Sequence, residues 1–177
     1  MLKNPKIQIR QLTQSTNVSS FDCGIPELND FLQRDAYKNQ TEWLSVTKVM
    51  YLDDKLVGYF TITPDTLHKG RIDISDKLND YPYQKYPAVK LARLAVDYRY
   101  QHRGLGKALM REFFYTAHQI AKIEGSRFIT VDAKTEAKTF YQMYLFVPVI
   151  SGTDSEIIPM YLDFKRFYDK TLSEIDE

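Results

Sequence analysis

The sequence predicts an α/β (α+β) protein in which strands and helices alternate along one domain spanning residues 1–177. Three observations lead to this fold class. Two β-rich runs, Val46–Leu52 and Leu56–Ile62, surround the turn Asp53-Asp54-Lys55, which is typical of a hairpin. An apolar strand, a glycine loop and a helical pattern follow one another from Val89 to Arg111. Further short strands alternate with helical patterns toward the C-terminus, so we expect helices packed on a central sheet.

Composition narrows the class of protein. The chain has 177 residues, 44% of them hydrophobic and 27% charged, as expected for a globular domain with its own core. Its net charge of +1 produces no global field for nucleic acid, although a local basic patch can still form. Cys23 is the only cysteine and is expected to be a small buried residue, so no internal disulfide forms. The three histidines are scattered and no cysteine pair occurs, so no metal site is predicted.

The amino-acid sequence predicts no targeting segment and no membrane helix. The N-terminal run lacks a signal-peptide core, and no stretch approaches the roughly 18 apolar residues of a membrane helix. We therefore expect a cytoplasmic protein with no membrane partner.

The segment Gln101-His102-Arg103-Gly104-Leu105-Gly106 carries the strongest functional signal. It follows the apolar strand and directly precedes the helical pattern. Free backbone N–H groups and the positive end of a helix dipole therefore converge there, where a phosphate can bind. Glycine at positions 104 and 106 keeps a Cβ out of the path of an anion. Lys107, in the first helical turn, is either a phosphate ligand or an ordinary surface lysine.

The spacing excludes two other phosphate loops. A P-loop needs a glycine where Gln101 stands and Ser or Thr where Ala108 stands, and a dinucleotide fingerprint needs a glycine at Leu109. An ordinary glycine turn between strand and helix remains an alternative. The pattern Gln/Arg-x-x-Gly-x-Gly/Ala after a Leu-Ala-Val strand resembles the acetyl-CoA loop of the GCN5-related N-acetyltransferases (GNAT).

The remaining elements are predicted as follows. In the N-terminal half we expect a strand at Ile7–Leu12, a helix from Pro26 to about Tyr37, a bulge or close backbone approach at Gly58, a strand end at Pro64, and a loop at Asp65–Pro87 that is either substrate-facing or a surface connection. In the C-terminal half we expect a helix ending at Gly125, a strand at Arg127–Asp132, a helix at Lys134–Tyr144, strands at Phe146–Val149 and Ile157–Phe164 around a turn at Ser151–Asp154, and a helix at Lys165–Ile175.

This order of elements resembles an N-acetyltransferase over most of the chain. Four motifs look more specifically like the acetyltransferase toxins of bacterial toxin–antitoxin pairs, which acetylate the α-amine of aminoacyl-tRNA. They are Phe21-Asp22-Cys23-Gly24 before Leu28-x-x-Phe31-Leu32, Gly58-Tyr59-Phe60, Leu91–Asp97, and Val131-Asp132-Ala133 followed by Phe140-Tyr141. The resemblance implies a GNAT fold, with a mixed central sheet of about six to seven strands, splayed at Leu94-Ala95-Val96 and flanked by helices on both faces.

The resemblance also implies residue roles. Acetyl-CoA, the co-substrate, would contact Leu94, Ala95, Val96, Gln101, His102, Arg103, Gly104, Leu105, Gly106, Lys107 and Phe140. The Val96 N–H would stabilise the oxyanion, and Tyr141 would protonate the leaving thiolate. Tyr141 is otherwise a core or cofactor-packing aromatic, because Phe140 and Tyr144 flank it at helical spacing.

Partners implied by the resemblance are aminoacyl-tRNA and a cognate antitoxin protein. Dimers are common in the family, although no apolar stripe in the sequence requires a homodimer. The low net charge departs from the basic surface of the toxins. Candidate basic residues are Lys85, Lys90, Arg93, Arg99, His102, Arg103, Lys107, Lys134 and Lys138. The alternatives are a non-toxic GNAT enzyme acting on a small amine, peptide or protein, and an acyl-CoA-binding sensor without turnover.

Overall fold

The computed structural model describes residues 6–150 and 156–173. Two compact units make up the chain: residues 1–63 with 91–116, and residues 64–90 with 117–177. We refer to them as unit 1 and unit 2. The turn predicted at Ser151–Asp154 and the last residues of the predicted terminal helix lie outside the described ranges. A single domain over residues 1–177 stays a prediction.

Among the described residues, seven strands form one sheet in the order β1-β2-β3-β4-β5-β7-β6. This agrees with the mixed sheet of about six to seven strands that the family resemblance implies. They are β1 (Ile7–Gln11), β2 (Val46–Leu52), β3 (Lys55–His68), β4 (Lys85–Val96), β5 (Phe128–Lys134), β6 (Val147–Pro148) and β7 (Ile157–Asp163). The pairs β1–β2, β2–β3, β5–β7 and β6–β7 are antiparallel.

The hairpin predicted between β2 and β3 is confirmed in unit 1. Leu52 pairs with Lys55, so the loop between the strands contains only Asp53 and Asp54. Both have positive φ, 47° and 64°. This is the mirror-image turn whose twist suits a two-residue hairpin, and aspartate tolerates it better than most residues.

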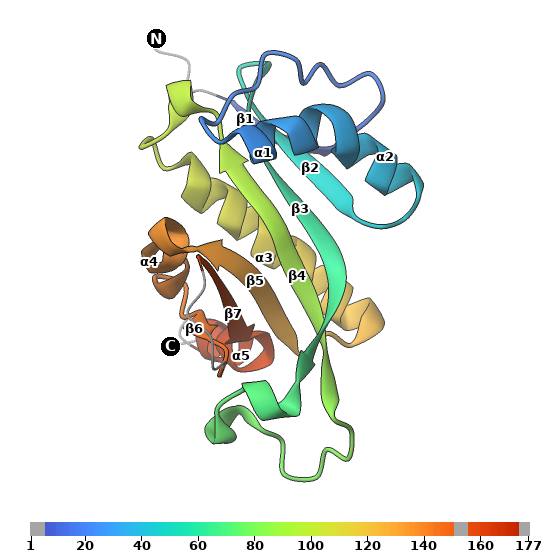
Figure 1. Ribbon diagram of the computed structural model, residues 1–177, viewed down its shortest axis with the longest axis vertical. Helices are drawn as coiled ribbons and strands as arrows, with labels where there is room; N and C mark the ends of the chain where they lie inside the picture. Colours follow the sequence, from blue (N-terminus) through green and yellow to red (C-terminus); the bar gives the residue numbers. More distant parts are fainter. Residues whose placement is uncertain (1–5, 151–155, 174–177) are drawn as a thin grey trace. The chain divides into compact units, whose positions relative to one another are not determined.

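Helices cover both faces of the sheet in unit 1 (Figure 1). Helix α1 (Pro26–Asp30), a π-helical segment (Phe31–Asp35) and α2 (Ala36–Thr41) follow without a break. Phe31 of this stretch stacks on Tyr59 of β3, and the Tyr59 hydroxyl donates to the Leu28 carbonyl at 2.8 Å. The next residue of β3, Phe60, points to the opposite face and packs against Phe113 of α3 (Leu105–Glu124).

Helix α2 ends in an unusual conformation at Trp43. The Leu44 N–H bonds to the Asn39 carbonyl at 2.8 Å and the Trp43 N–H to the Gln40 carbonyl at 3.2 Å, the two bonds of a Schellman ending. This ending places the residue after the cap in the left-handed region, usually as glycine. Here it is Trp43, with φ of 57° and a side chain 93% exposed.

Both features predicted at Gly58 are present. The register of β2 and β3 shifts between Met50 and Tyr51, which places a bulge beside Gly58. A Cβ at Gly58 would lie 3.0 Å from the Ala95 carbonyl oxygen and 3.0 Å from Leu109 Cδ1. Glycine therefore allows β4 and α3 to approach β3 closely.

The prediction that Pro64 ends its strand is wrong, because β3 continues to His68. Pairing with β2 stops at Val46 and Ile62, so beyond that point no ladder bond with β2 requires an N–H. Proline is tolerated in a strand under this condition.

The segment predicted as a loop at Asp65–Pro87 is largely ordered in unit 2. It contains the end of β3, short 3₁₀ turns at Lys69–Arg71 and Ile74–Asp76, and the start of β4. The Tyr161 hydroxyl of β7 accepts from the Asp73 N–H at 3.0 Å and donates to the Asp76 carboxylate at 2.8 Å. A tyrosine distant in sequence therefore fixes the second turn.

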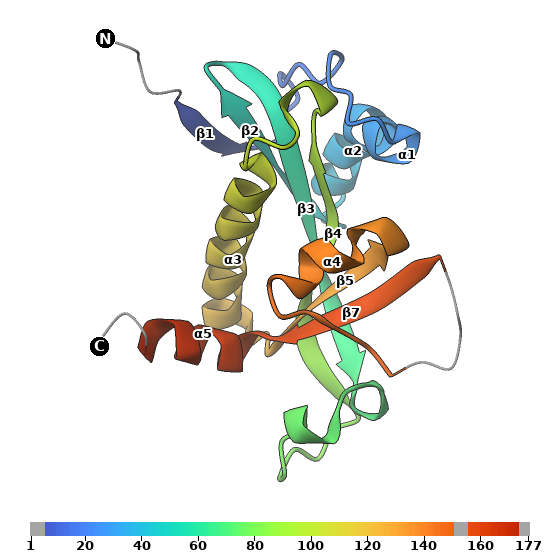
Figure 2. The same ribbon diagram turned by 90° about the vertical axis from the view of Figure 1, so that its left-hand side faces the viewer.

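The rest of unit 2 consists of β5, β7 and the helices around them (Figure 2). Strands β5 and β7 pair along their full length, and α5 (Phe164–Ser173) continues directly from β7. The core contains Leu67, Ile72, Tyr86, Ala88, Phe128, Val149 and Tyr161. No helix among the described residues is long and apolar enough to cross a membrane.

Candidate functional site

The glycine loop lies in unit 1 between β4 and α3. After β4 ends at Val96, a 3₁₀ turn covers Tyr98–Tyr100, and α3 begins at Leu105. His102 and Gly104 have φ of 59° and 79°, so the backbone reverses at both. Leu105 is buried, whereas residues 102–104 and Lys107 are exposed. The loop is thus anchored by one apolar side chain while its main chain stays accessible.

Backbone N–H groups of this loop are available to a ligand. In the part of the chain that the structure describes, no N–H from residue 102 to 107 donates a hydrogen bond. The first bond of α3 runs from the Ala108 N–H to the Gly104 carbonyl at 3.2 Å. Unpaired N–H groups at the start of a 20-residue helix carry the positive end of its dipole. The loop therefore fits a pyrophosphate.

The end of β4 presents one edge to a ligand. The Asp97 N–H bonds to the Val57 carbonyl of β3 at 2.9 Å. Because successive N–H groups of a strand point in opposite directions, the Val96 N–H points away from β3. Leu94 and Val96 are half-buried and Ala95 between them is buried. The Val96 N–H can therefore pair with an extended amide chain, whereas its carbonyl accepts from Gln101 Nε2 at 2.9 Å.

Gln101 holds the loop against two other segments. Its Nε2 donates to the Val96 carbonyl at 2.9 Å and to the Cys23 carbonyl at 3.1 Å. The amide nitrogen is thus used within the protein, and only the amide oxygen remains for a ligand. The role of Gln101 as a direct contact of the co-substrate stays a prediction.

The carboxylate of Asp97 is the centre of a buried hydrogen-bond network. The sequence motifs assign no role to this residue. Its fully buried carboxylate accepts from the Asp22 N–H at 3.1 Å, the Arg99 N–H at 3.0 Å, and Arg99 Nε and Nη2 at 2.8 and 2.7 Å. Arg99 Nη2 also donates to the Ser20 carbonyl at 2.8 Å. Burial alone would raise the pKa of Asp97, but these hydrogen bonds outweigh it and hold the pKa below its usual value.

The Phe21–Gly24 motif lies against this centre. The Tyr98 N–H donates to the Asp22 carbonyl at 2.8 Å, so the motif and the glycine loop share hydrogen bonds. Cys23 is buried, and burial raises the pKa of its thiol. Cys23 is therefore a packed residue, as predicted. Its thiol stays protonated, and a protonated thiol is a poor nucleophile.

Several predicted basic residues already have partners. Arg99 pairs with Asp97, and Lys90 pairs with Asp132 at 2.5 Å in unit 2. Arg93 lies over the Phe31 ring at 3.9 Å, and Arg103 over the Tyr100 ring at 5.4 Å. Arg93 is thus held against an aromatic ring and is not a free surface charge. The two ion pairs reduce the positive charge available to a polyanion, whereas the two ring contacts leave the charge of the arginines in place.

Tyr141 lies in unit 2, on α4 (Lys138–Gln142). Its ring makes edge contacts with Phe140 at 5.3 Å and Phe146 at 5.8 Å, and the residue is 7% exposed. Burial raises the pKa of Tyr141 to about 12. The phenol is therefore protonated at every physiological pH, as a proton donor must be.

The structure thus groups the predicted residues in two sets. Unit 1 holds Leu94–Val96 and Gln101–Lys107, and unit 2 holds Phe140 and Tyr141. Among the described residues, no three His, Cys, Asp or Glu side chains gather as metal ligands. The order strand, accessible glycine loop and helix is the local geometry that a CoA pyrophosphate requires.

The sequence profile of the acetyltransferase (GNAT) domain matches residues 43–147. The chain belongs to the GNAT family. It is an acetyltransferase, and its co-substrate is acetyl-CoA. The matched range includes the hairpin, the glycine loop and Tyr141.

Relatives of this acetyltransferase support the assignment. It is 32% identical over 146 residues to a tRNA-acetylating toxin of Mycobacterium tuberculosis, covering 82% of this chain and 86% of the relative. AtaT complexed with acetyl-methionyl-tRNAfMet matches with a TM-score of 0.83 and 22% identity, covering 94% of this chain and 99% of AtaT. An AtaT mutant bound to the C-terminus of its antitoxin AtaR and to acetyl-CoA has a TM-score of 0.74 and 20% identity, with coverage of 93% and 98%. These structures confirm the predicted GNAT fold.

Proposed function

We propose that the protein is a toxin that transfers acetyl from acetyl-CoA to the α-amine of aminoacyl-tRNA. The observation that carries the proposal is the 32% identity to a tRNA-acetylating toxin over 82% of this chain. AtaT is seen in complex with acetyl-methionyl-tRNAfMet, which agrees with this acceptor.

The residues of unit 1 bind acetyl-CoA. The N–H groups from His102 to Lys107 take the pyrophosphate, because they have no partner among the described residues and stand at the start of α3. The exposed Lys107 adds a positive charge there. The pantetheine amides pair with the main chain of Leu94–Val96 as an added strand would. The buried side chain of Leu105 anchors the loop.

Acetyl transfer requires one bond to form and one to break. The neutral α-amine attacks the thioester carbonyl carbon, and the Val96 N–H stabilises the charge that develops on its oxygen. The C–S bond then breaks, the nitrogen loses its extra proton to solvent, and the thiolate takes a proton from the Tyr141 hydroxyl. Solvent afterwards returns a proton to the tyrosinate.

The raised pKa of Tyr141 affects this step in two ways. With a pKa of about 12, the phenol is always protonated but is a weaker acid than an exposed tyrosine. A thiolate formed in a dry site is also destabilised by lost solvation, so the pKa of its thiol rises in the same direction. The raised pKa of Tyr141 keeps its proton in place until a thiolate forms, and a thiolate in such a site is basic enough to take it.

No separate base is needed for the amine. An α-amino group has a pKa near 7.7–8.0, so a useful fraction is already neutral at pH 7. This agrees with the sequence, in which no Glu or His stands out as a base for the amine. The enzyme needs only to bind the acceptor and supply the acid.

A cognate antitoxin, a cytoplasmic location and a homodimer complete the proposal. The antitoxin is supported by AtaT, which is seen with the C-terminus of AtaR. The cytoplasm is where charged tRNA and acetyl-CoA are both found. A single cysteine fits a reducing compartment.

The test is acetyl transfer from labelled acetyl-CoA to a pool of charged tRNAs, beside a panel of small amines and peptides. We expect label on aminoacyl-tRNA, and the labelled species identifies the amino acid. Label only on small amines or peptides would replace this acceptor with another one. Toxicity on expression, relieved by the product of an adjacent gene, tests the toxin–antitoxin role.

A further inference from the structure

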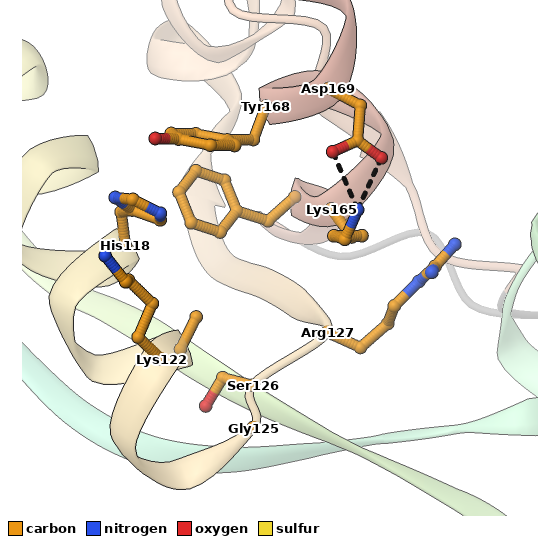
Figure 3. A pocket seen from close by; sticks show the side chains of 10 residues that line it. His118, Lys122, Gly125, Ser126, Arg127, Lys165, Tyr168 and Asp169 are labelled. Carbon is orange, nitrogen blue, oxygen red and sulfur yellow. Dashed lines mark hydrogen bonds and ion pairs between the residues drawn. The ribbon is translucent and has the colours of Figure 1, made fainter. Parts of the chain in front are cut away.

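A pocket of about 430 Å³ lies in unit 2, between the end of α3, the start of β5 and α5. It is lined by His118, Ala121, Lys122, Gly125, Ser126, Arg127, Phe164, Lys165, Tyr168 and Asp169. Figure 3 shows His118, Lys122 and Tyr168 on one side and Arg127, Lys165 and Asp169 on the other. Its volume is in the range of small-ligand sites. The acetyl transfer described above uses none of these residues.

Hydrogen-bond donors at this pocket are unused. Among the described residues, the Lys122 amino group, the Ser126 hydroxyl and the Tyr168 hydroxyl make no hydrogen bond or ion pair. The Nε of Arg127 is buried without a partner in the same part of the chain. Of these groups only Arg127 Nε is buried, and buried donors are rarely left unpaired, so a ligand with acceptor atoms suits this part of the pocket. The other three donors reach the surface and are open to the same ligand.

The charge of the lining is positive. The lining contains three basic side chains, Lys122, Arg127 and Lys165, and one carboxylate, Asp169. That carboxylate pairs with Lys165 at 2.6 Å, but both side chains are more than half exposed, so solvent screens the pair. The guanidinium of Arg127 pairs with Asp163 at 2.6 Å. Lys122 is left as the charge that can bind an anion.

Aromatic rings form the apolar part of the wall. The His118 and Tyr168 rings stack at 3.9 Å, and Tyr168 lies 6.3 Å from Phe164. This stacking holds Tyr168 in a fixed orientation and covers one face of its ring, while Phe164 is buried. The part of the Tyr168 ring that His118 does not cover is the aromatic surface open to a ligand. Flat aromatic surfaces beside lysine are the usual means of holding an unpaired base and its phosphate.

We propose that this pocket binds a nucleotide, with its phosphate at Lys122 and Ser126 and its base against the ring of Tyr168. The ligand is either a free nucleotide or an unpaired nucleotide within RNA, because both present the same ring and phosphate. The inference stands on the pocket alone and does not depend on acetyl transfer or on its acceptor.

The experiment measures binding by isothermal titration calorimetry on the full chain. No CoA is added, because CoA carries a base and phosphates of its own and would compete for the pocket. Binding of a probe at the acetyl-CoA loop is recognised because Lys122→Ala does not change it. The probes are AMP and a short unstructured oligoadenylate, with adenosine as the control that lacks the phosphate. The variants are Lys122→Ala and Tyr168→Ala, with Lys38→Ala as the matched control, because Lys38 is an exposed lysine on α2 that does not line the pocket.

We expect Lys122→Ala to weaken binding about tenfold, the loss of one charge-assisted contact, and Lys38→Ala to leave it unchanged. Adenosine should bind wild type and Lys122→Ala equally. Weakening with AMP assigns the pocket to free nucleotides, and weakening with the oligonucleotide alone assigns it to RNA. Equal affinity of wild type and Lys122→Ala for both probes, or no binding of either, would overturn the proposal. Lys122 is exposed, so its replacement leaves the fold intact even if Tyr168→Ala does not.

Discussion

Replacing Asp97 by asparagine tests the hydrogen-bond centre that joins β4 to the glycine loop. The substitution keeps the size of the side chain but turns one carboxylate oxygen into an NH₂ group. Oδ2 accepts from the Asp22 N–H and Arg99 Nη2, and Oδ1 from the Arg99 N–H and Nε. In either orientation of the amide, the new NH₂ faces two donors. Two charge-assisted hydrogen bonds are therefore lost, and buried donors are left unpaired.

The magnitude follows from these contacts. Hydrogen bonds to a charged group contribute about 1.5–3 kcal/mol each. Arg99 is 47% exposed at its side chain, so water replaces part of what the guanidinium loses. The Asp22 N–H, facing a carboxylate that is 0% exposed, has no such replacement. We expect Asp97→Asn to lower the free energy of unfolding by about 3 kcal/mol, below the upper range for breaking a buried ion pair.

The assay is urea unfolding followed by circular dichroism at neutral pH, with the exposed Asp80→Asn as the control. The pH dependence gives a second test. The pKa of Asp97 is lowered by folding, so its contribution is fully present above the unfolded pKa near 3.9 and is lost as pH falls through the folded pKa. The gap between wild type and variant should therefore narrow below about pH 4. A variant within 0.5 kcal/mol of wild type at pH 7 would refute the reasoning.

Three further predictions concern stability. Trp43→Gly should raise the free energy of unfolding by about 1 kcal/mol, because glycine suits the left-handed φ of 57° and the exposed indole buries little; a lower thermal midpoint would contradict this. Gly58→Ala should cost about 1–3 kcal/mol and raise the KM for acetyl-CoA, because its Cβ would press on the Ala95 carbonyl at 3.0 Å; unchanged stability and KM would show that the approach is not tight. Folding raises the pKa of Tyr141, so its contribution to the free energy of unfolding is present below pH 10 and is lost as pH rises toward about 12. Tyr141→Phe should therefore make the free energy of unfolding fall less steeply over that pH window. The same pH dependence in the variant and in wild type would argue against deep burial of Tyr141.

Local signals in the sequence predicted the elements that local chemistry decides. The two aspartates of the hairpin, the close approach at Gly58 and the helix end at Gly125, with φ of 77°, each follow from backbone geometry at one position. The strand end predicted at Pro64 is wrong because a proline interrupts a strand only where a neighbouring strand needs its N–H. Whether β2 still pairs beside Pro64 cannot be read from the residues around it.

Contacts between distant segments could not be predicted. The Asp97 carboxylate meets the Asp22 N–H across 75 residues, and the Tyr161 hydroxyl fixes a turn 85 residues away. No pattern of spacing marks either pair. An acidic residue directly after an apolar strand, two positions before an arginine, was the available signal for Asp97. The proposed nucleotide pocket could not be predicted either, because its lining comes from α3 and α5, which are far apart in the sequence.

The most direct test of the account compares wild type with Tyr141→Phe in acetyl transfer to charged tRNA, with acetyl-CoA affinity measured on the same samples. The account predicts label on aminoacyl-tRNA with wild type. It predicts a loss of at least about 100-fold in turnover for the variant, the usual contribution of a general acid, with acetyl-CoA affinity unchanged. Undiminished turnover in Tyr141→Phe, or no label on any charged tRNA with the wild-type enzyme, would contradict it.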